Sequence, residues 1–386
     1  MLEFLDEKKC SGCYACVSKC PKSCIEMICD SEGFWYPHIN KDICVSCGLC
    51  KEVCPVLNAV SSKDSDPLQC YAAYNDDKKT KENSSSGGIF SLLAERILNG
   101  GGVVFGAAFA DDFKSVEHIA IQNIEELPLL RGSKYLQSRI GDAYAQAKLF
   151  LDSGRKVLFS GTPCQIGGLY AYLGKDYDNL ITQDIICHGV PSPLVWEKYV
   201  EYREGKASSK TQSAFFRYKK YGWKMYSVKF VFENRTEHIH PLSDDLYMRG
   251  FLADLYLRPS CYNCSFKARK HLSDITLADF WGIEKIDSSM YDPKGTSLVI
   301  VNTDKGESLF NQMSGLTKKS EDLDTAIRYN PALIKSANTN KNRKTFFDNF
   351  GKINFDKLIN KCIKISFKNK IKRVVKKLLS IIKDKH

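Results

Sequence analysis

Short apolar runs and helical apolar stripes alternate along the middle of the chain. The apolar runs predict strands at Gln69–Asn75, Gly102–Phe109, Lys156–Ser160 and Leu180–Cys187. Helices are predicted at Gly88–Leu98, at Arg139–Asp152 and directly after the turn at 161–165. In the second of these helices, Ile140, Tyr144, Ala147 and Leu151 share one face. Strands that alternate with helices in this way predict an α/β sheet with parallel strands.

The end of the chain has a different pattern. Six apolar residues recur there at helical spacing: Ile371, Val374, Val375, Leu378, Leu379 and Ile382. Lysine and arginine occupy the other faces, so residues 357–386 are predicted to form a basic amphipathic helix suited to an anionic membrane surface. The alternatives are an ordinary packed helix, or a basic face for an acidic partner protein.

The net charge of +11 is concentrated in this tail. Residues 357–386 contain eleven Lys and Arg and one Asp, so the rest of the chain is nearly neutral. A neutral body argues against a nucleic-acid-binding protein. The first residues lack the features of a secretory signal, and no run reaches the roughly 20 apolar residues that cross a bilayer. We therefore expect a cytoplasmic protein, peripheral on the inner face of the cell membrane if the tail binds there.

Ten of the sixteen cysteines lie before residue 55. Without an export signal they are better explained as metal ligands than as disulfides. Two runs have the spacing C-x2-C-x2-C-x3-C-P and are offset by 34 residues: Cys10, Cys13, Cys16 and Cys20, and Cys44, Cys47, Cys50 and Cys54. This is the bacterial two-cluster ferredoxin pattern, in which the fourth cysteine of each run binds the other cluster.

On that rule, one [4Fe–4S] cluster is held by Cys10, Cys13, Cys16 and Cys54, and the second by Cys44, Cys47, Cys50 and Cys20. Zinc is the alternative, but zinc sites more often use two separated C-x2-C pairs. Between the runs, residues 33–37 (GFWYP) predict an aromatic hairpin that covers the clusters. Four cysteines fit neither run and receive no role: Cys24, Cys29, Cys70 and Cys362.

Several loops at predicted strand ends carry candidate chemistry. Ligands of parallel sheets bind at the carboxyl ends of strands, where residues 84–88 (SSSGG), GTPCQ at 161–165 and 187–189 (CHG) are predicted to lie. The serine and glycine loop precedes a helix, so it could bind a phosphate; the alternative is an N-cap and a tight turn. No GxGxxG motif supports a nicotinamide site.

Four further cysteines lie in loops of this region: Cys164, Cys187, Cys261 and Cys264. Thiols delivered from three loops could enclose a third cluster. The alternative is two buried thiols beside a C-x2-C pair that holds zinc or nothing.

Taken together, these segments resemble the coenzyme F420 hydrogenase/dehydrogenase beta-subunit family, in its form with a fused two-cluster ferredoxin domain. The resemblance rests on SSSGGIF at 84–90, RGSKYLQS at 131–138, FSGTPCQIGGL at 159–169, DIICHGVPSP at 184–193 and RPSCYNCSFKARKHLSDITLADFWG at 258–282. It implies FAD, a [4Fe–4S] cluster held by the four body cysteines, and electron relay between them. The deazaflavin coenzyme F420 is a further cofactor candidate.

The resemblance also implies which residues lie near the flavin: Ser85, Gly87, Gly88, Lys134, Tyr135, Ser138, Thr162 and Gln165. Lys134 could place a cation beside the flavin ring or its diphosphate. Asp279 and Trp281 could border the site, and Trp281 could equally belong to the core.

The predicted fold class is α+β/α/β: a bacterial-ferredoxin-like module, an α/β flavin-binding body and a C-terminal basic amphipathic helix. The predicted organisation is a ferredoxin-type domain (1–57), a polar linker (58–68), the flavin and iron–sulfur body (69–310), a C-terminal extension (311–356) and the tail (357–386).

The leading functional hypothesis is an iron–sulfur flavoprotein oxidoreductase that relays electrons between [4Fe–4S] clusters and FAD, with a redox partner protein or ferredoxin at one end. The alternative is an iron–sulfur electron carrier or scaffold without flavin turnover, serving a membrane-associated pathway such as surface polysaccharide synthesis.

Overall fold

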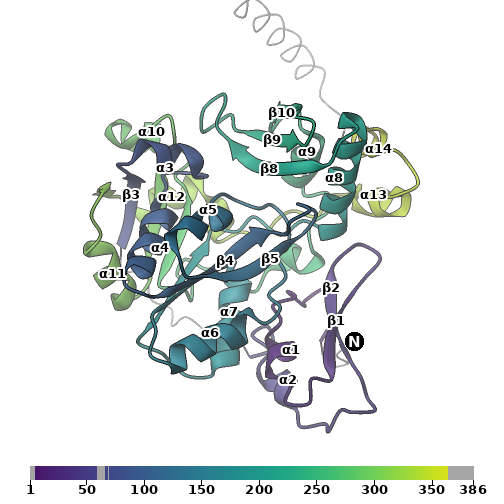
Figure 1. Ribbon diagram of the computed structural model, residues 1–386, viewed down its shortest axis with the longest axis horizontal. Helices are drawn as coiled ribbons and strands as arrows, with labels where there is room; N and C mark the ends of the chain where they lie inside the picture. Colours follow the sequence, from purple (N-terminus) through teal and green to yellow (C-terminus); the bar gives the residue numbers. More distant parts are fainter. Residues whose placement is uncertain (1–4, 59–65, 68, 364–386) are drawn as a thin grey trace, which may run out of the picture.

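The computed structural model describes residues 5–58, 66–67 and 69–363. Figure 1 shows a small N-terminal module beside a larger body, which contains one large sheet and one small sheet. Most of the predicted linker and the tail from residue 364 onward lie outside the described residues. In the described part of the chain, no helix is long and apolar enough to cross a membrane.

The N-terminal module contains one β-hairpin and two short helices. Its elements are α1 (Ala15–Lys19), β1 (Ile25–Cys29), β2 (Trp35–Ile39) and α2 (Leu49–Glu52). Asp30 forms the hairpin turn, because its carboxylate accepts hydrogen bonds from the backbone N–H groups of Glu32 and Phe34. Gly33 has a φ of +89°, which favours glycine. The structure confirms the aromatic hairpin between the cysteine runs.

The large sheet has eight strands in the order β13-β3-β12-β11-β7-β6-β4-β5. They are β3 (Gln69–Asn75), β4 (Val103–Phe109), β5 (Val116–Ile121), β6 (Val157–Ser160), β7 (Leu180–Ile185), β11 (Ile275–Asp279), β12 (Ser297–Val301) and β13 (Leu316–Ser320). Only the pairs β4–β6, β6–β7 and β7–β11 are parallel, and the other four are antiparallel. The prediction of a parallel sheet is therefore correct for its centre and wrong for its edges.

Helices cover both faces of this sheet. One face carries α4 (Ile89–Asn99), α5 (Leu127–Leu130) and α11 (Asp304–Asn311), and the opposite face carries α6 (Ala143–Asp152), α7 (Pro163–Leu173), α10 (Ile283–Ile286) and α12 (Leu323–Tyr329). Neighbouring side chains of β4 enter different cores: Val104 packs under α4, and Phe105 packs under α6 and α7. Burial on both faces explains why these strands are continuously apolar.

The small sheet was not predicted from the sequence. It consists of β8 (Thr211–Tyr218), β9 (Ser227–Phe232) and β10 (Glu237–Pro241), all antiparallel, and packs with α8 (Pro193–Ala207), α9 (Leu246–Leu252), α13 (Arg343–Asn349) and α14 (Phe355–Cys362). Trp196, Tyr199 and Phe230 lie at the centre of this aromatic core. The remaining elements are short: α3 (Lys78–Asn83), η1 (Ile124–Glu126), η2 (Pro259–Asn263), η3 (Ser288–Met290) and η4 (Pro331–Leu333).

The helix predicted from Arg139 begins later, at Ala143. The reason is strand pairing: the N–H of Arg139 donates to the carbonyl of Val116, and its carbonyl accepts from the N–H of His118. Ile140, although outside the helix, is buried as its pattern predicts.

The last described helix, α14, overlaps the start of the predicted tail. In α14, Phe355, Leu358, Ile359 and Cys362 are buried in the small-sheet core. The predicted tail at 357–386 thus begins inside a packed helix, and its apolar stripe at 371–382 lies outside the described residues. The predicted C-terminal extension is likewise part of the body, since it supplies β13.

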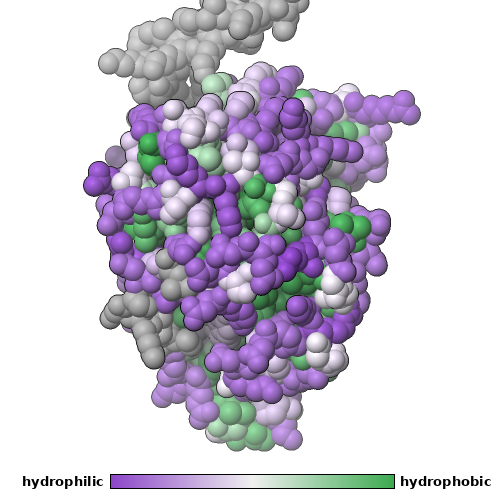
Figure 2. Space-filling view, turned by 90° about the vertical axis from the view of Figure 1, so that its left-hand side faces the viewer, coloured by the Kyte–Doolittle hydropathy of each residue, from purple (hydrophilic) through white to green (hydrophobic). Residues whose placement is uncertain are grey.

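Strand β13 forms an exposed edge of the large sheet. Lys318 and Lys319 lie on it, and charged side chains on an edge strand discourage pairing with another chain. Figure 2 shows the side of the molecule at this edge, where hydrophilic residues dominate and hydrophobic ones form only small separate groups.

Candidate functional site

A large cavity lies at the carboxyl ends of the parallel strands and measures about 570 Å³. Loops after β3, β6, β7 and β11 line it, as the strand-end argument predicts. Seven of the eight predicted flavin residues are in its wall: Ser85, Gly88, Lys134, Tyr135, Ser138, Thr162 and Gln165. The eighth, Gly87, lies behind the wall, where an added Cβ would come within 2.6 Å of the carbonyl oxygen of Ala73.

The serine and glycine loop at 84–88 is held rigidly. Ser85 Oγ accepts hydrogen bonds from the N–H and hydroxyl of Ser133, at 2.7 and 2.8 Å. Gly88 is the N-cap of α4 with a φ of +85°, so the first turn of this helix begins at the cavity wall. The free N–H groups of a helix start favour an anion such as a phosphate.

The cavity floor contains a chain of hydrogen bonds through a residue that the sequence did not indicate, His118. Gln165 Nε2 donates to Ser138 Oγ at 2.9 Å, and Ser138 Oγ lies 3.0 Å from His118 Nδ1. His118 Nε2 in turn lies 3.0 Å from the carbonyl of Ser160. Burial lowers the pKa of His118 to about 4, so its ring is neutral at pH 7. Ser138 and Gln165 therefore hold each other's side chains in place at the cavity floor.

Lys134 is a weaker cation than the sequence suggested. Its ammonium group donates to the carbonyls of Leu129 and Arg131, at 2.9 and 3.2 Å. Loss of hydration lowers its pKa to about 7, so the side chain is only partly charged near neutral pH.

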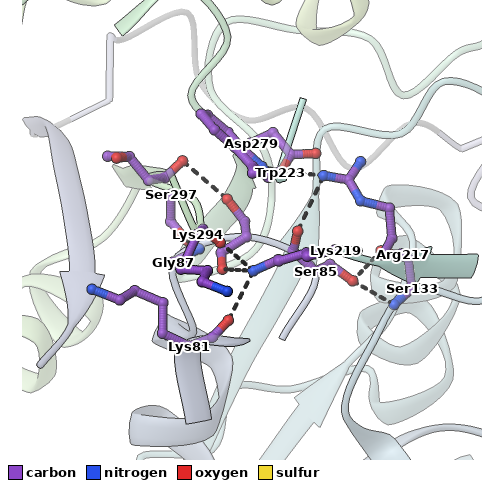
Figure 3. A network of polar contacts seen from close by, with 12 residues as sticks. Lys81, Ser85, Gly87, Ser133, Arg217, Lys219, Trp223, Asp279, Lys294 and Ser297 are labelled. Atoms are coloured by element: carbon purple, nitrogen blue, oxygen red, sulfur yellow. Dashed lines mark hydrogen bonds and ion pairs between the residues drawn. The ribbon is translucent and has the colours of Figure 1, made fainter. Parts of the chain in front are cut away.

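The cavity residue that keeps its positive charge is Arg217, which comes from β8 of the small sheet and is 7% exposed. Figure 3 shows how it reaches Asp279 and Ser85. Its Nη2 donates to Asp279 Oδ1 at 2.7 Å and to the carbonyl of Ser85 at 3.1 Å, and Nη1 donates to Tyr135 Oη at 3.2 Å. Burial alone would lower the pKa of Arg217, but Asp279 raises it well above its usual value. Nε of Arg217 is buried without a described partner.

Asp279 and Trp281, predicted to border the site, both line the cavity. Trp223 Nε1 donates to Asp279 Oδ1 at 2.5 Å (Figure 3), and the Trp223 ring stacks on Trp281 with centroids 5.1 Å apart. No motif in residues 211–226 indicates this role, because only the fold brings the β8–β9 hairpin to the strand ends.

A second, smaller cavity of about 40 Å³ is bounded by all four body cysteines: Cys164, Cys187, Cys261 and Cys264. Cys164 lies in the first turn of α7, Cys187 follows β7, and the other two lie in and just after η2. Burial raises the pKa of Cys187 and of Cys261 to about 12, so these sulfurs become thiolates only when a cation binds them. The sequence-predicted set is thus brought together around one space.

Polar groups around this cavity fit a sulfur-rich cluster. The N–H of Val190 donates to Cys261 Sγ at 3.4 Å, and Thr162 Oγ1 lies 3.1 Å from Cys164 Sγ. His271 also lines the cavity, and its Nε2 has no partner among the described residues, whereas Nδ1 bonds Asp184 Oδ2 at 2.9 Å.

Within residues 5–58, 66–67 and 69–363, no three His, Cys, Asp or Glu side chains converge as a single metal ion requires. A cubane differs, because each thiolate binds a separate iron.

In the N-terminal module the cysteines fall into two groups. Burial raises the pKa of Cys13 to about 12, and the neighbouring Cys10 and Cys54 add to this. Cys16 has Cys13, Cys10 and Cys54 as neighbours. Cys54, the last cysteine of the second run, thus lies with the first run.

The other group is nearer the surface. Cys50 has Cys47 and Cys20 as neighbours, and Cys47 is exposed. Cys24, which the spacing left without a role, lies between this group's members: its Sγ is 3.3 Å from that of Cys20, and it also contacts Cys44.

These sites lie in series. Cys16 contacts both N-terminal groups, and Cys13 packs on α7, because a Cβ added to Gly168 would lie 3.0 Å from that of Cys13. Helix α7 carries Cys164 into the small cavity. The two cavities share part of their walls: Ser11, Cys164, Cys187, His188, Gly189 and Val190. The order is therefore surface cysteine group, buried cysteine group, body cysteines and large cavity.

The fold and these sites define an iron–sulfur protein with a dicluster ferredoxin module on a mixed α/β body. Residues 3–61 match the family described as a 4Fe-4S dicluster domain, and residues 154–322 match the family described as the C terminus of the coenzyme F420 hydrogenase/dehydrogenase beta subunit. The resemblance to that beta-subunit family, with a fused dicluster ferredoxin domain, is thereby confirmed.

Individual proteins are more distantly similar. The coenzyme F420-dependent sulfite reductase of Methanocaldococcus jannaschii is 23% identical over 312 residues, which are 80% of this chain and 46% of that protein. An uncharacterized protein of the same organism is 25% identical over 222 residues, 46% of this chain and 56% of that protein. The chain thus spans about half the length of these relatives. A chain of the F420-reducing [NiFe] hydrogenase complex from Methanosarcina barkeri aligns over 74% of this chain and 92% of that one, with 19% identity and a TM-score of 0.48.

Proposed function

We propose that the protein is an iron–sulfur flavoprotein oxidoreductase that transfers electrons between a redox partner protein and an organic substrate. The observation that carries the proposal is the shared wall of the two cavities, in which Cys164 and Cys187 border both. A cluster in the small cavity and a flavin in the large one would be in contact through these residues.

In this proposal twelve cysteines hold three [4Fe–4S] clusters. Cys10, Cys13, Cys16 and Cys54 hold one, Cys20, Cys44, Cys47 and Cys50 hold the second, and Cys164, Cys187, Cys261 and Cys264 hold the third. The exposed Cys47 lies in the surface group, so a redox partner such as a ferredoxin would exchange electrons at that end.

The large cavity is proposed to bind FAD, which would convert single electrons into two-electron chemistry. The loop at 84–88 and the start of α4 would bind its diphosphate. Arg217, fixed by Asp279, would hold a permanent positive charge beside the ligand. Buried Ser138 and Gln165 would keep the floor dry and rigid.

The substrate is not defined by these residues. The resemblance puts forward a deazaflavin, coenzyme F420, as one candidate.

Residues 364–386 hold nine Lys and Arg and one Asp, and we propose that they attach the protein to the inner face of an anionic membrane. The predicted ferredoxin-type domain (1–57), linker (58–68) and body from residue 69 are part of the same proposal, with residues 311–363 included in the body.

The relay is tested by flavin reduction in the anaerobic holoprotein. A reduced bacterial ferredoxin is mixed with wild type and with the double variant Cys261→Ser/Cys264→Ser, and bleaching of flavin absorbance is followed by stopped flow. Because a protein donor cannot enter the cavity, we expect rapid bleaching in wild type and much slower bleaching in the variant at equal FAD content. Cys70→Ser is the matched control, since Cys70 is a buried cysteine of β3 that lines neither cavity.

Two results would contradict the proposal. Equal bleaching rates in the double variant and wild type would mean that electrons bypass the body cysteines. A wild-type protein with clusters but no flavin would favour the electron-carrier alternative.

A further inference from the structure

Arg258 is a fully buried cation at the contact between the N-terminal module and the body. Its exposed fraction is 0%. Nε donates to the carbonyl of Cys10 at 2.8 Å, Nη1 to Gln137 Oε1 at 3.0 Å and Nη2 to the carbonyl of Trp35 at 3.0 Å. The side chain thus joins both parts of the molecule.

All of these partners are neutral. The rings of Tyr36 and Phe34 also lie near, with centroids 4.3 and 5.6 Å from the guanidinium carbon. Among residues 5–58, 66–67 and 69–363, no Asp or Glu forms an ion pair with Arg258, whereas buried Arg217 pairs with Asp279. A guanidinium stays charged in proteins, and a buried charge without a counter-charge is strongly unfavourable. The described protein atoms therefore leave one positive charge uncompensated.

Arg258 lies between two cysteine groups. Gly12 stands in the loop that joins Cys10 and Cys13, and a Cβ added to it would lie 3.0 Å from the guanidinium carbon of Arg258. On the other side, the N–H of Cys261 donates to the carbonyl of Arg258 at 2.9 Å. The side chain of Arg258 thus contacts the loop of the buried N-terminal group, and its backbone is bonded to Cys261, three residues further along the chain.

A four-iron cluster with four thiolate ligands carries a net negative charge, which increases on reduction. We propose that Arg258 is the shared counter-charge of the two clusters at this junction and raises the reduction potential of both. The inference rests on the proposed function, which puts a cluster in each of these groups. Arg258 lines neither cavity, so it is a positioning residue rather than a catalytic one.

The test is an anaerobic redox titration of the holoprotein, with each cluster followed by electron paramagnetic resonance. Arg258→Gln should lower the reduction equilibrium constant of the two neighbouring clusters at least tenfold, or about 59 mV for one electron. Arg258→Lys keeps the charge and should shift them less. The cluster of the surface group should change least, because it lies farther from the removed charge.

A second variant covers the case in which Arg258→Gln does not fold. Gln137→Glu places a carboxylate where an amide now accepts from Arg258, so it neutralises the charge in place. It should lower the same two potentials. Arg343→Gln is the control: it also breaks a contact between module and body, to Glu32, but removes a cation already paired with a carboxylate.

Three results would overturn the inference: unchanged potentials in Arg258→Gln or Gln137→Glu, equal shifts in Arg258→Lys and Arg258→Gln, or an equal shift in Arg343→Gln. Iron content separates this failure from failure of the proposed function. About 12 iron atoms per chain with unchanged potentials contradicts the role of Arg258 alone, whereas about eight contradicts the third cluster itself.

Discussion

At the scale of single residues, burial decides which polar groups can act in the large cavity. Lys134 was the cation that the sequence singled out, yet loss of hydration leaves it only partly charged. Arg217 carries the lasting charge, because Asp279 lies 2.7 Å away. The sequence could not indicate Arg217, since its partner is 62 positions along the chain.

Arg217→Gln should destabilise the protein by about 3–5 kcal/mol, because it leaves the largely buried Asp279 without its cation. FAD content should fall as well. Urea unfolding and flavin release measure the two effects. Lys148→Gln, which breaks an exposed ion pair with Asp152 in α6, should change stability by no more than about 0.5 kcal/mol. If Arg217→Gln lowers the free energy of unfolding by less than about 1 kcal/mol, the Arg217–Asp279 ion pair contributes little to stability.

His118 makes stability depend on pH. Its pKa is about 4 in the folded protein, below its ordinary value, because burial disfavours the charged ring. The unfolded chain therefore binds more protons, and stability should fall as pH decreases from about 6.5 to about 4, by up to roughly 3 kcal/mol. His118→Gln should remove that part of the dependence, measured as the difference in unfolding midpoint between pH 7 and pH 5. Parallel pH profiles for both proteins would contradict this origin.

At the scale of elements, the sequence predicted the strands of the sheet centre well and their directions less well. The predicted ends of β3, β4, β6 and β7 agree with the structure to within two residues, because strands buried on both faces are continuously apolar. Direction is not encoded in that pattern. Strands β5, β12 and β13 run against their neighbours. The small sheet was not predicted, although residues 211–241 hold apolar runs separated by the turn residues Gly222 and Asn234.

The loop at 84–88 depends on close packing against the sheet. An added Cβ at Gly87 would lie 2.6 Å from the carbonyl oxygen of Ala73 and 2.8 Å from the backbone nitrogen of Ser297. Gly87→Ala should therefore displace the loop, lower stability by about 1–3 kcal/mol and reduce FAD binding. Thermal unfolding and flavin content measure both.

Gly205→Ala is the matched control for that substitution. Gly205 lies in α8 with nothing near its Cβ position, so alanine should raise stability by about 0.5–1 kcal/mol. Retained FAD and unchanged stability in Gly87→Ala would mean that the loop can shift without consequence.

At the scale of the whole molecule, the doubled cysteine run predicted the N-terminal module, because ligand spacing is a local property. The junction between module and body was not predictable in the same way. It is built by contacts such as Arg258 with Cys10 and Tyr144 with Cys13, which join residues more than a hundred positions apart. The four body cysteines were proposed as one possible cluster site from their place in three loops, with zinc or an empty pair as the alternative, and the family resemblance favoured the cluster.

Removal of the basic tail tests the proposed membrane attachment. The deletion should begin at residue 364, because residues 355–362 form a helix packed in the core. The truncated protein should keep its clusters but no longer sediment with vesicles of anionic phospholipid, since nine basic residues are lost. Zwitterionic vesicles are the control. Equal sedimentation of full-length and truncated protein would contradict the attachment.

In the proposed oxidoreductase, three clusters and one flavin occupy a single chain. The most direct measurement is the amount of iron, sulfide and FAD per chain in anaerobically purified protein. We expect about 12 iron atoms, an equal amount of sulfide and one FAD. About eight iron atoms without flavin would contradict it, because the four body cysteines and the large cavity would then hold neither cofactor.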